Sequence, residues 1–88
     1  MKRFKEKLCE VLEIPKEISM DYPHLTVIGK NQLFLQNGKG IVSYTDTEIQ
    51  IHTSVYFLKI VGSGLIIRQM NGEMTEIRGN ITNICFED

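Results

Sequence analysis

The side chains that could carry chemistry in this 88-residue chain are few, and none stands in a pattern that a reaction needs. Neither His24 nor His52 belongs to a recognised metal-binding motif. Cys9 and Cys85 lie 76 residues apart, so the sequence has no CxxC pair and no disulfide framework. We therefore predict no metal and no cofactor, and we expect two reduced thiols, as in a cytosolic protein.

Candidate nucleophiles are equally isolated. Ser43, Ser54 and Ser63 lack both a nucleophile elbow and a paired base in the sequence. The segment Gly62-Ser63-Gly64 lacks the Lys-Ser/Thr ending of a phosphate-binding loop, and a strand-like segment follows it where a helix would be required. We interpret it as a hairpin turn, predict no catalytic residue and expect a protein that is not an enzyme.

Nucleic-acid binding is the weaker functional interpretation. The net charge of −1 argues against a module whose affinity comes from neutralising phosphates. Binding of single strands needs basic residues interleaved with exposed aromatic residues. Basic residues such as Lys39, Lys59, Arg68 and Arg78 are thinly spread through the strand-like region. A small β-barrel that binds nucleic acid or a ligand in a regulatory role is therefore kept as the alternative function.

Length and composition indicate one globular domain over residues 1–88. Hydrophobic residues make up 42% and charged residues 24%, which are ordinary values for a folded protein. No stretch approaches the roughly 20 apolar residues of a membrane helix. Glutamates interrupt the N-terminal residues, so these do not resemble a signal peptide. We expect a cytoplasmic protein without a transmembrane segment of its own.

The first residues predict an amphipathic helix over 2–13. Phe4, Leu8 and Val11 recur at helical spacing, and Pro15 ends the pattern because the residue before a proline is disfavoured in helical geometry. Such a helix, flanked by basic residues, could cap one end of the core or bind a membrane surface or a partner. We favour the cap.

Residues 24–87 have a different sequence pattern, with about eight short apolar or alternating runs separated by turn residues. This pattern is typical of an all-β protein. We predict hairpin or meander repeats that form a small sandwich or barrel. Asn37-Gly38 and Asn71-Gly72 suit two-residue hairpin turns, because both central residues of a type I′ turn need a positive φ.

The turn residues between these runs also recur at a longer, nearly regular spacing. Gly29, Asp46, Gly62 and Gly79 are separated by 17, 16 and 17 residues. Either a stack of hairpin-like units or a β-solenoid with rungs of ~17 residues would produce it. The Asn-Gly turns favour hairpins, since tight reversals do not belong in a parallel coil, and the solenoid is the alternative.

Several runs are apolar on both faces, whereas a sheet with one wet face should alternate apolar and polar residues. The second face is a candidate contact with a partner or another copy, unless the N-terminal helix and long side chains cover it. Together with the helix face, the candidate interaction surface consists of Phe4, Leu8, Val11, Phe34, Val42, Tyr44, Phe57 and Ile66.

An ordered set of residues runs through the chain from about residue 5 to 87. Its members are Leu12, Ile14-Pro15-Lys16, Asp21, Pro23, Ile28-Gly29, Leu33, Leu35, Asn37, Lys39-Gly40-Ile41, Tyr44, Leu58, Ile60, Gly62, Leu65, Ile67, Ile77, Gly79 and Ile81. This set resembles the YabP/YqfC family of endospore-formation proteins, and it is most similar to the YqfC branch.

The resemblance implies a small, non-enzymatic protein made during sporulation of Gram-positive bacteria. Family members look like accessory or assembly factors of the mother cell, and YqfC-like proteins are associated with a polytopic membrane partner. We therefore expect a cytoplasmic protein of the mother cell, peripheral to the membrane around the forespore. It would act through protein–protein interaction or by oligomerisation, and nucleic acid is not the partner that we expect.

Overall fold

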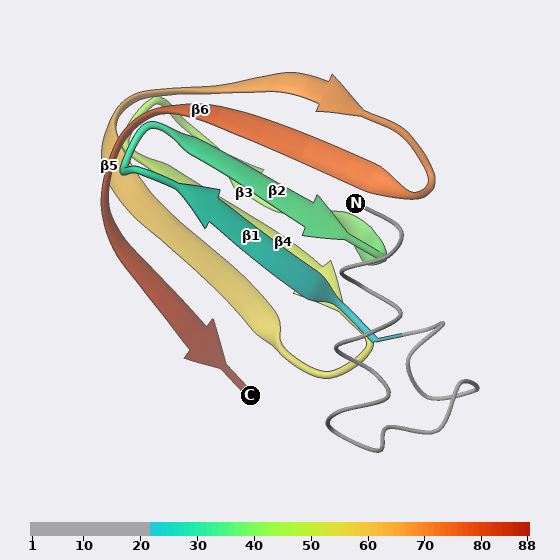
Figure 1. Ribbon diagram of the computed structural model, residues 1–88. Helices are drawn as coiled ribbons and strands as arrows, with labels where there is room; N and C mark the ends of the chain where they lie inside the picture. The colour runs from blue at the N-terminus through green and yellow to red at the C-terminus, as the bar shows by residue number, and fades with distance from the viewer. Residues whose placement is uncertain (1–21) are drawn as a thin grey trace.

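In the computed structural model, which describes residues 22–88, the chain forms six β-strands. They are β1 (His24–Ile28), β2 (Gln32–Gln36), β3 (Gly38–Tyr44), β4 (Glu48–Thr53), β5 (Phe57–Met70) and β6 (Met74–Glu87). The strands make one sheet in the order β1-β2-β6-β5-β4-β3 (Figure 1), and all neighbouring pairs are antiparallel. The helix predicted over 2–13 lies outside the described residues.

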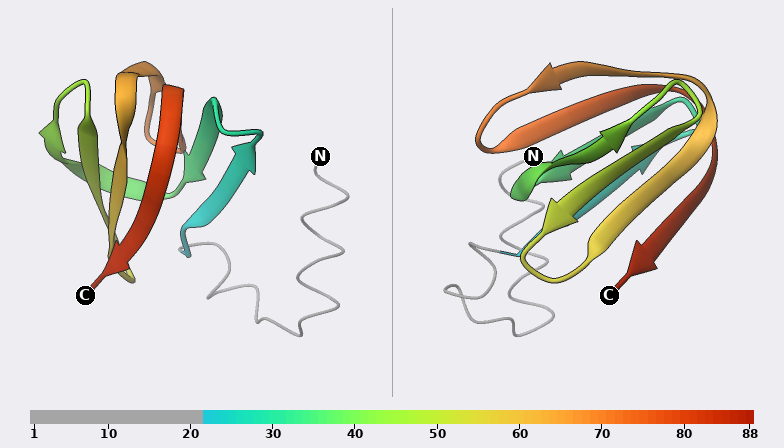
Figure 2. Two further views of the ribbon diagram at one scale, coloured as in Figure 1. Left: turned by 90° about the vertical axis from the view of Figure 1, so that its left-hand side faces the viewer. Right: turned by 180° about the vertical axis from the view of Figure 1, so that it is seen from behind.

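The hairpin of β5 and β6 bends near its middle and so divides the sheet into two arms (Figure 2). The first arm, called the β4 arm, contains β3, β4 and residues 57–61 and 83–87 of the hairpin. The second, called the β2 arm, contains β1, β2 and residues 65–70 and 74–79. One continuous sheet therefore supplies two layers that face each other.

Glycines permit this bend because the two strand backbones approach closely there. A Cβ atom on Gly62 would overlap the carbonyl oxygen of Asn80. A Cβ atom on Gly79, whose φ is +142°, would lie 2.7 Å from the carbonyl oxygen of Gly64. The register of β5 and β6 also shifts between Val61 and Gly62, as in a β-bulge, which bends and twists a strand.

Two turns hold the bend from either side, the β1–β2 turn and the β3–β4 turn. Four backbone amides of the bend donate hydrogen bonds to carbonyls of these turns: Gly62 to Thr47 (3.0 Å), Leu65 to Asp46 (2.8 Å), Gly79 to Asn31 (3.2 Å) and Ile81 to Lys30 (2.8 Å). The spacing of 17, 16 and 17 residues therefore corresponds to the two turns and the two bent strands that meet at the bend.

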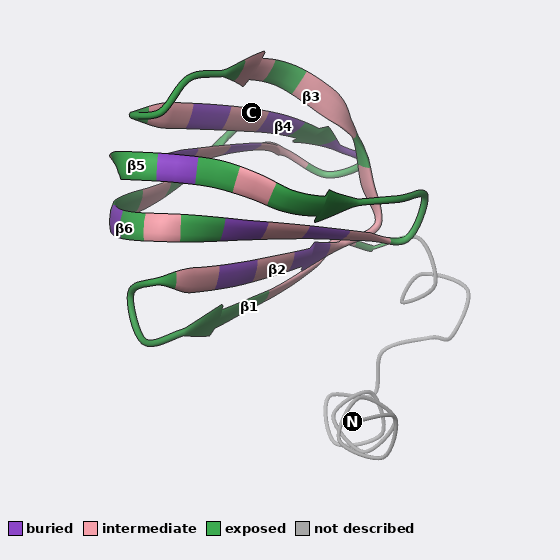
Figure 3. Cartoon of the chain, turned by 90° about the horizontal axis from the view of Figure 1, so that it is seen from above, coloured by how far each residue is buried: buried purple, intermediate pink, exposed green. Residues whose placement is uncertain are grey.

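The core lies between the two arms. Buried and less buried residues alternate along β2 and β4 (Figure 3), as the period of two in a strand requires. The buried apolar residues are Leu33, Leu35, Ile49, Ile51, Leu58, Ile60, Leu65, Ile77 and Ile81. Burial of each such side chain contributes roughly 1.5–3 kcal/mol, so this small core depends on both arms staying folded together.

The all-β class is confirmed, but the predicted architecture needs correction. There are six strands rather than about eight, because Gly62-Ser63-Gly64 and Gly79-Asn80 bend long strands instead of ending short ones. The prediction of a hairpin turn at Gly62–Gly64 is therefore wrong. The sheet is open and bent, neither a closed barrel nor two separate sheets, and its antiparallel pairing rules out the solenoid.

The two Asn-Gly sites also differ from the prediction. Asn71 does begin the β5–β6 connection, and its Oδ1 accepts hydrogen bonds from the amides of Glu73 and Met74, both at 2.9 Å. Neither Asn71 nor Gly72 has a positive φ, so the turn is not type I′. Asn37 has a φ of 66°, but it lies between β2 and β3, which are not paired and occupy different arms.

Candidate functional site

The described residues bring no reactive cluster together. Among residues 22–88, no group of three or more His, Cys, Asp or Glu side chains could hold a metal ion. His52 stacks on Phe57 with ring centroids 4.9 Å apart, and Cys85 is a free, exposed thiol. The features that stand out are instead apolar side chains on the edges and outer faces of the sheet.

One open side of the bent sheet is bridged by a side chain. The β3 edge lies near residues 65–70 of β5, and the amide of Ile67 donates a 3.0 Å hydrogen bond to the hydroxyl of Tyr44. This bond occupies an amide that would otherwise belong to an unpaired strand edge. Tyr44 therefore links the β4 arm to the β2 arm across the gap between them.

The other open side is a groove between β1 and the C-terminal half of β6. Its volume is about 220 Å³, and the residues that line it are Val27, Gly29, Lys30, Ile81, Thr82, Asn83 and Ile84. Val27 pairs with the buried Leu33 and so lies on the inner face, yet it is 41% exposed. Apolar inner-face side chains therefore reach solvent along this groove.

Phe86 extends the apolar character of this side along β6. It pairs with the buried Leu58, which places it on the inner face, but it is 61% exposed. Its ring packs edge-on against Tyr56 at 4.8 Å, and burial raises the pKa of the Tyr56 hydroxyl above its ordinary value. The sequence did not single out Val27, Ile84 or Phe86, because the alternating run "ITNICFE" looks like any half-buried strand.

Two of the predicted surface residues lie on the outer face of the β2 arm. Phe34 is half-buried in β2 and Ile66 is 47% exposed in β5. β6 lies between them, with Glu76 opposite Phe34 and Arg78 opposite Ile66. Glu76 accepts hydrogen bonds from Arg78 at 2.8 Å and from Gln32 at 3.0 Å. These bonds, with Arg78 first, hold the pKa of the Glu76 carboxyl below its usual range.

The remaining predicted residues lie elsewhere. Val42 is 53% exposed at a register shift of β3, close in sequence to Tyr44 on the same edge. Phe57 lies on the outer face of the β4 arm beside His52. Phe4, Leu8 and Val11 fall outside the described residues. The structure thus places the members of the predicted surface that fall within residues 22–88 at several separate positions.

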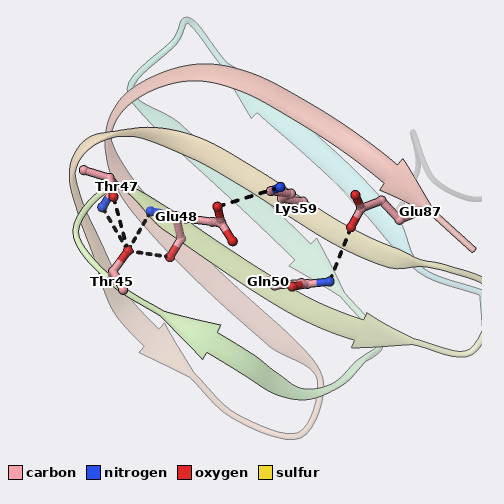
Figure 4. Close-up of polar contacts among 6 residues, drawn as sticks. All are labelled: Thr45, Thr47, Glu48, Gln50, Lys59 and Glu87. Atoms are coloured by element: carbon pink, nitrogen blue, oxygen red, sulfur yellow. Dashed lines mark hydrogen bonds and ion pairs between the residues drawn. The ribbon is translucent and has the colours of Figure 1, made fainter.

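The outer face of the β4 arm also carries a set of polar contacts (Figure 4). Lys59 pairs with Glu48 at 3.8 Å, and Gln50 donates a 3.4 Å hydrogen bond to Glu87. Thr45 stabilises the β3–β4 turn, because its hydroxyl accepts hydrogen bonds from the amides of Thr47 at 3.3 Å and Glu48 at 3.0 Å. The groove, by contrast, exposes the apolar side chains of Val27 and Ile84.

Comparisons with known proteins support the resemblance to the YabP/YqfC family. Residues 21–88 match the YabP family. The chain is 27% identical over 84 residues to the uncharacterized protein YqfC of Bacillus subtilis (strain 168), and the alignment covers 96% of this chain and 90% of that protein. No solved structure gives a significant match.

Proposed function

Since the chain belongs to the YabP family, we propose that it is a non-enzymatic accessory or assembly factor of bacterial endospore formation. It acts in the mother cell by binding a protein partner or by self-association. The process is inferred from the resemblance to endospore-formation proteins, and the mode of action from the surface of the sheet.

The observation that carries the mode of action is the exposure of large apolar side chains at the edges and outer faces of the sheet. Exposed apolar side chains that gather along an edge or groove can form a contact with another protein. These exposed side chains include Val27, Ile28, Val42, Ile66, Met70 and Phe86. Binding would cover such side chains and add to a small core.

A polytopic membrane protein of sporulation is the partner class that we propose. The protein would then lie at the membrane around the forespore through that partner. Residues 22–88 contain no helix that is long and apolar enough to cross a membrane. Ile66, which is 47% exposed on the outer face of the β2 arm, offers an apolar side chain for such a contact.

Affinity purification from sporulating cells tests this function. The full-length tagged chain should recover a membrane or coat protein, and Ile66→Asp should recover less of it while keeping the same circular dichroism spectrum. The matched control is Arg68→Asp, an exposed position two residues along the same strand. A deletion strain should also form fewer heat-resistant spores. If wild-type chain recovers no such protein and the deletion strain sporulates normally, the proposal is wrong.

A different measurement distinguishes the alternative function, a nucleic-acid or ligand binder, from the proposed assembly factor. Binding to single-stranded nucleic acid through phosphates would weaken steeply with added salt. On the outer face of the β2 arm, Arg78 is already paired with Glu76 at 2.8 Å. Salt-dependent binding of single-stranded nucleic acid to the purified protein would favour the alternative.

A further inference from the structure

We propose that residues 83–87 of β6 pair with the same residues of a second copy of this chain. The two strands run antiparallel about a twofold axis, so that the two sheets join at this edge. This inference deepens the proposed function, because it rests on self-association and assigns a surface to it. Its steps come from the edges of the sheet, the exposed side chains and the charges of β6.

The first step compares the strand edges that no described strand covers. The edge of β3 is interrupted by two register shifts, and β5 beyond the bend has another between Ile67 and Gln69. Tyr44 also occupies the amide of Ile67. β1 has five residues and follows Pro23. Short length, bulges and proline are features that protect edges from pairing with other chains.

The C-terminal half of β6 has none of these features. Its pairing with β5 continues without a shift from Asn83 opposite Val61 to Glu87 opposite Phe57. Residues 82–86 contain no proline and no charged side chain. Among the strands of residues 22–88, this is therefore the regular edge that is left open to an added strand.

The second step concerns what an added strand would cover. Ile84 and Phe86 alternate on the inner face, opposite Ile60 and Leu58, and Cys85 lies on the outer face opposite Lys59. Phe86 is 61% exposed, the largest exposed fraction among the large hydrophobic side chains of the described residues. A strand beside β6 would bring a second set of inner-face side chains over Phe86 and the groove, and cross-strand aromatic and aliphatic pairs stabilise sheets.

The third step is that this edge complements itself. With Cys85 at the twofold axis, Ile84 of one copy lies opposite Phe86 of the other, and Asn83 lies opposite Glu87. A parallel arrangement would instead place the Glu87 carboxylates side by side, and like charges directly opposite each other destabilise a sheet. The antiparallel arrangement separates the acidic ends, and an interface of this kind is isologous, the commonest form of dimer.

The same register brings the two Cys85 side chains together on the outer face. Directly opposed residues of an antiparallel pair have Cα atoms about 4.5–5.5 Å apart, which a disulfide can span. Cys85 is free and exposed, so it serves as a built-in probe of the pairing. Diamide, a thiol oxidant, would take up the two electrons and two protons released as the two thiols join.

The test uses the full chain with Cys9→Ser, so that Cys85 is the remaining thiol. Non-reducing gels should show a covalent dimer soon after diamide is added. The control chain carries Cys9→Ser, Cys85→Ser and Thr26→Cys, which moves the thiol to an exposed position on β1, the edge strand across the groove. Its dimer should form at least roughly tenfold more slowly, because pre-paired thiols react at a raised effective concentration.

A second measurement follows the unmodified protein and Phe86→Asp by sedimentation across a dilution series. The wild-type chain should dissociate from dimer to monomer on dilution, and Phe86→Asp should stay monomeric with an unchanged circular dichroism spectrum. Met70→Asp, another exposed apolar position, is the matched control and should dimerise like wild type. If Phe86→Asp does not fold, the comparison of the two single-thiol chains still decides.

Two outcomes overturn the inference. One is a wild-type monomer at every concentration together with equal cross-linking of the two single-thiol chains. The other is a monomer whose Cys85 cross-links to a different protein in sporulating cells, which would assign the edge to that protein. Recovery of a partner by the wild-type chain would leave the proposed function standing in either case, so the two failures are distinguishable.

Discussion

The backbone at Gly62 lies so close to the backbone at Asn80 that a methyl group on Gly62 would overlap the Asn80 carbonyl oxygen. The contact joins β5 to β6 at the bend, where carbonyls of two turns also accept hydrogen bonds from amides of the strands. The core residues of both arms face each other only because the hairpin bends there. This relationship therefore determines the fold more directly than any single core side chain.

Gly62→Ala should be strongly destabilising. The neighbouring atoms are backbone and cannot rotate away, so we expect a loss of about 3 kcal/mol in the free energy of unfolding. Urea denaturation followed by circular dichroism measures it. The matched control is Gly72→Ala, where no atom lies within 4 Å of the added methyl group and φ is not positive. That variant should be neutral or gain about 0.4–1 kcal/mol, and equal losses in both would contradict the account of the bend.

Tyr44→Phe removes the hydroxyl that accepts the amide of Ile67. Because Tyr44 is 49% exposed, water can replace part of this bond, and we expect a loss of only about 0.5–1 kcal/mol. The clearer result should be faster hydrogen exchange of the Ile67 amide, measured by NMR. Tyr22→Phe, which alters another exposed tyrosine, should leave that exchange rate unchanged.

Thr53→Val tests the connection between β4 and β5. Thr53 is 2% exposed, and its hydroxyl donates to the carbonyl of Tyr56 at 2.7 Å and accepts from the amides of Val55 and Tyr56 at 3.2 and 2.9 Å. Valine has a similar shape but leaves the amides of Val55 and Tyr56 without this acceptor, so we expect a loss of about 1–3 kcal/mol in unfolding free energy. Thr26→Val, at an exposed position of β1, should change it by less than about 0.5 kcal/mol.

The sequence predicts the strands well where alternation is local. The run "QLFLQ" buries Leu33 and Leu35, and "EIQIHT" buries Ile49 and Ile51. The bend is different, because a glycine inside a strand and a glycine in a turn look the same in the sequence. What distinguishes Gly62 is the carbonyl of Asn80, which approaches from a different strand. Local patterns do not contain that information.

The candidate surface, too, can be predicted from local sequence patterns only in part. Ile66 and Phe34 can be proposed from apolar runs that occupy both faces of a strand, and the structure places both on the outer face of the β2 arm. Phe86 could not be singled out, since it alternates correctly with its neighbours and lies on the inner face. Only the strand order reveals that no described strand lies beside it.

The carboxylate of Glu76 should make stability depend on pH. Its hydrogen bonds from Arg78 and Gln32 lower its pKa in the folded protein below the ordinary value of about 4.5. A lowered folded pKa means that the unfolded chain takes up a proton first as the pH falls. The contribution of Glu76 is therefore complete above the ordinary pKa and is lost as the pH falls through the lowered folded value.

Glu76→Gln should accordingly be less stable than wild type near neutral pH, and the difference in unfolding free energy should shrink as the pH falls below about 4.5. Urea denaturation at a series of pH values measures this difference. Arg78→Gln should reduce the same pH dependence, because it removes the largest cause of the lowered pKa. The double variant should lose less than the sum of the two single losses, since they share one interaction. Fully additive losses, or a Glu76→Gln difference that is the same at every pH, would show that the pair does not stabilise the β2 arm.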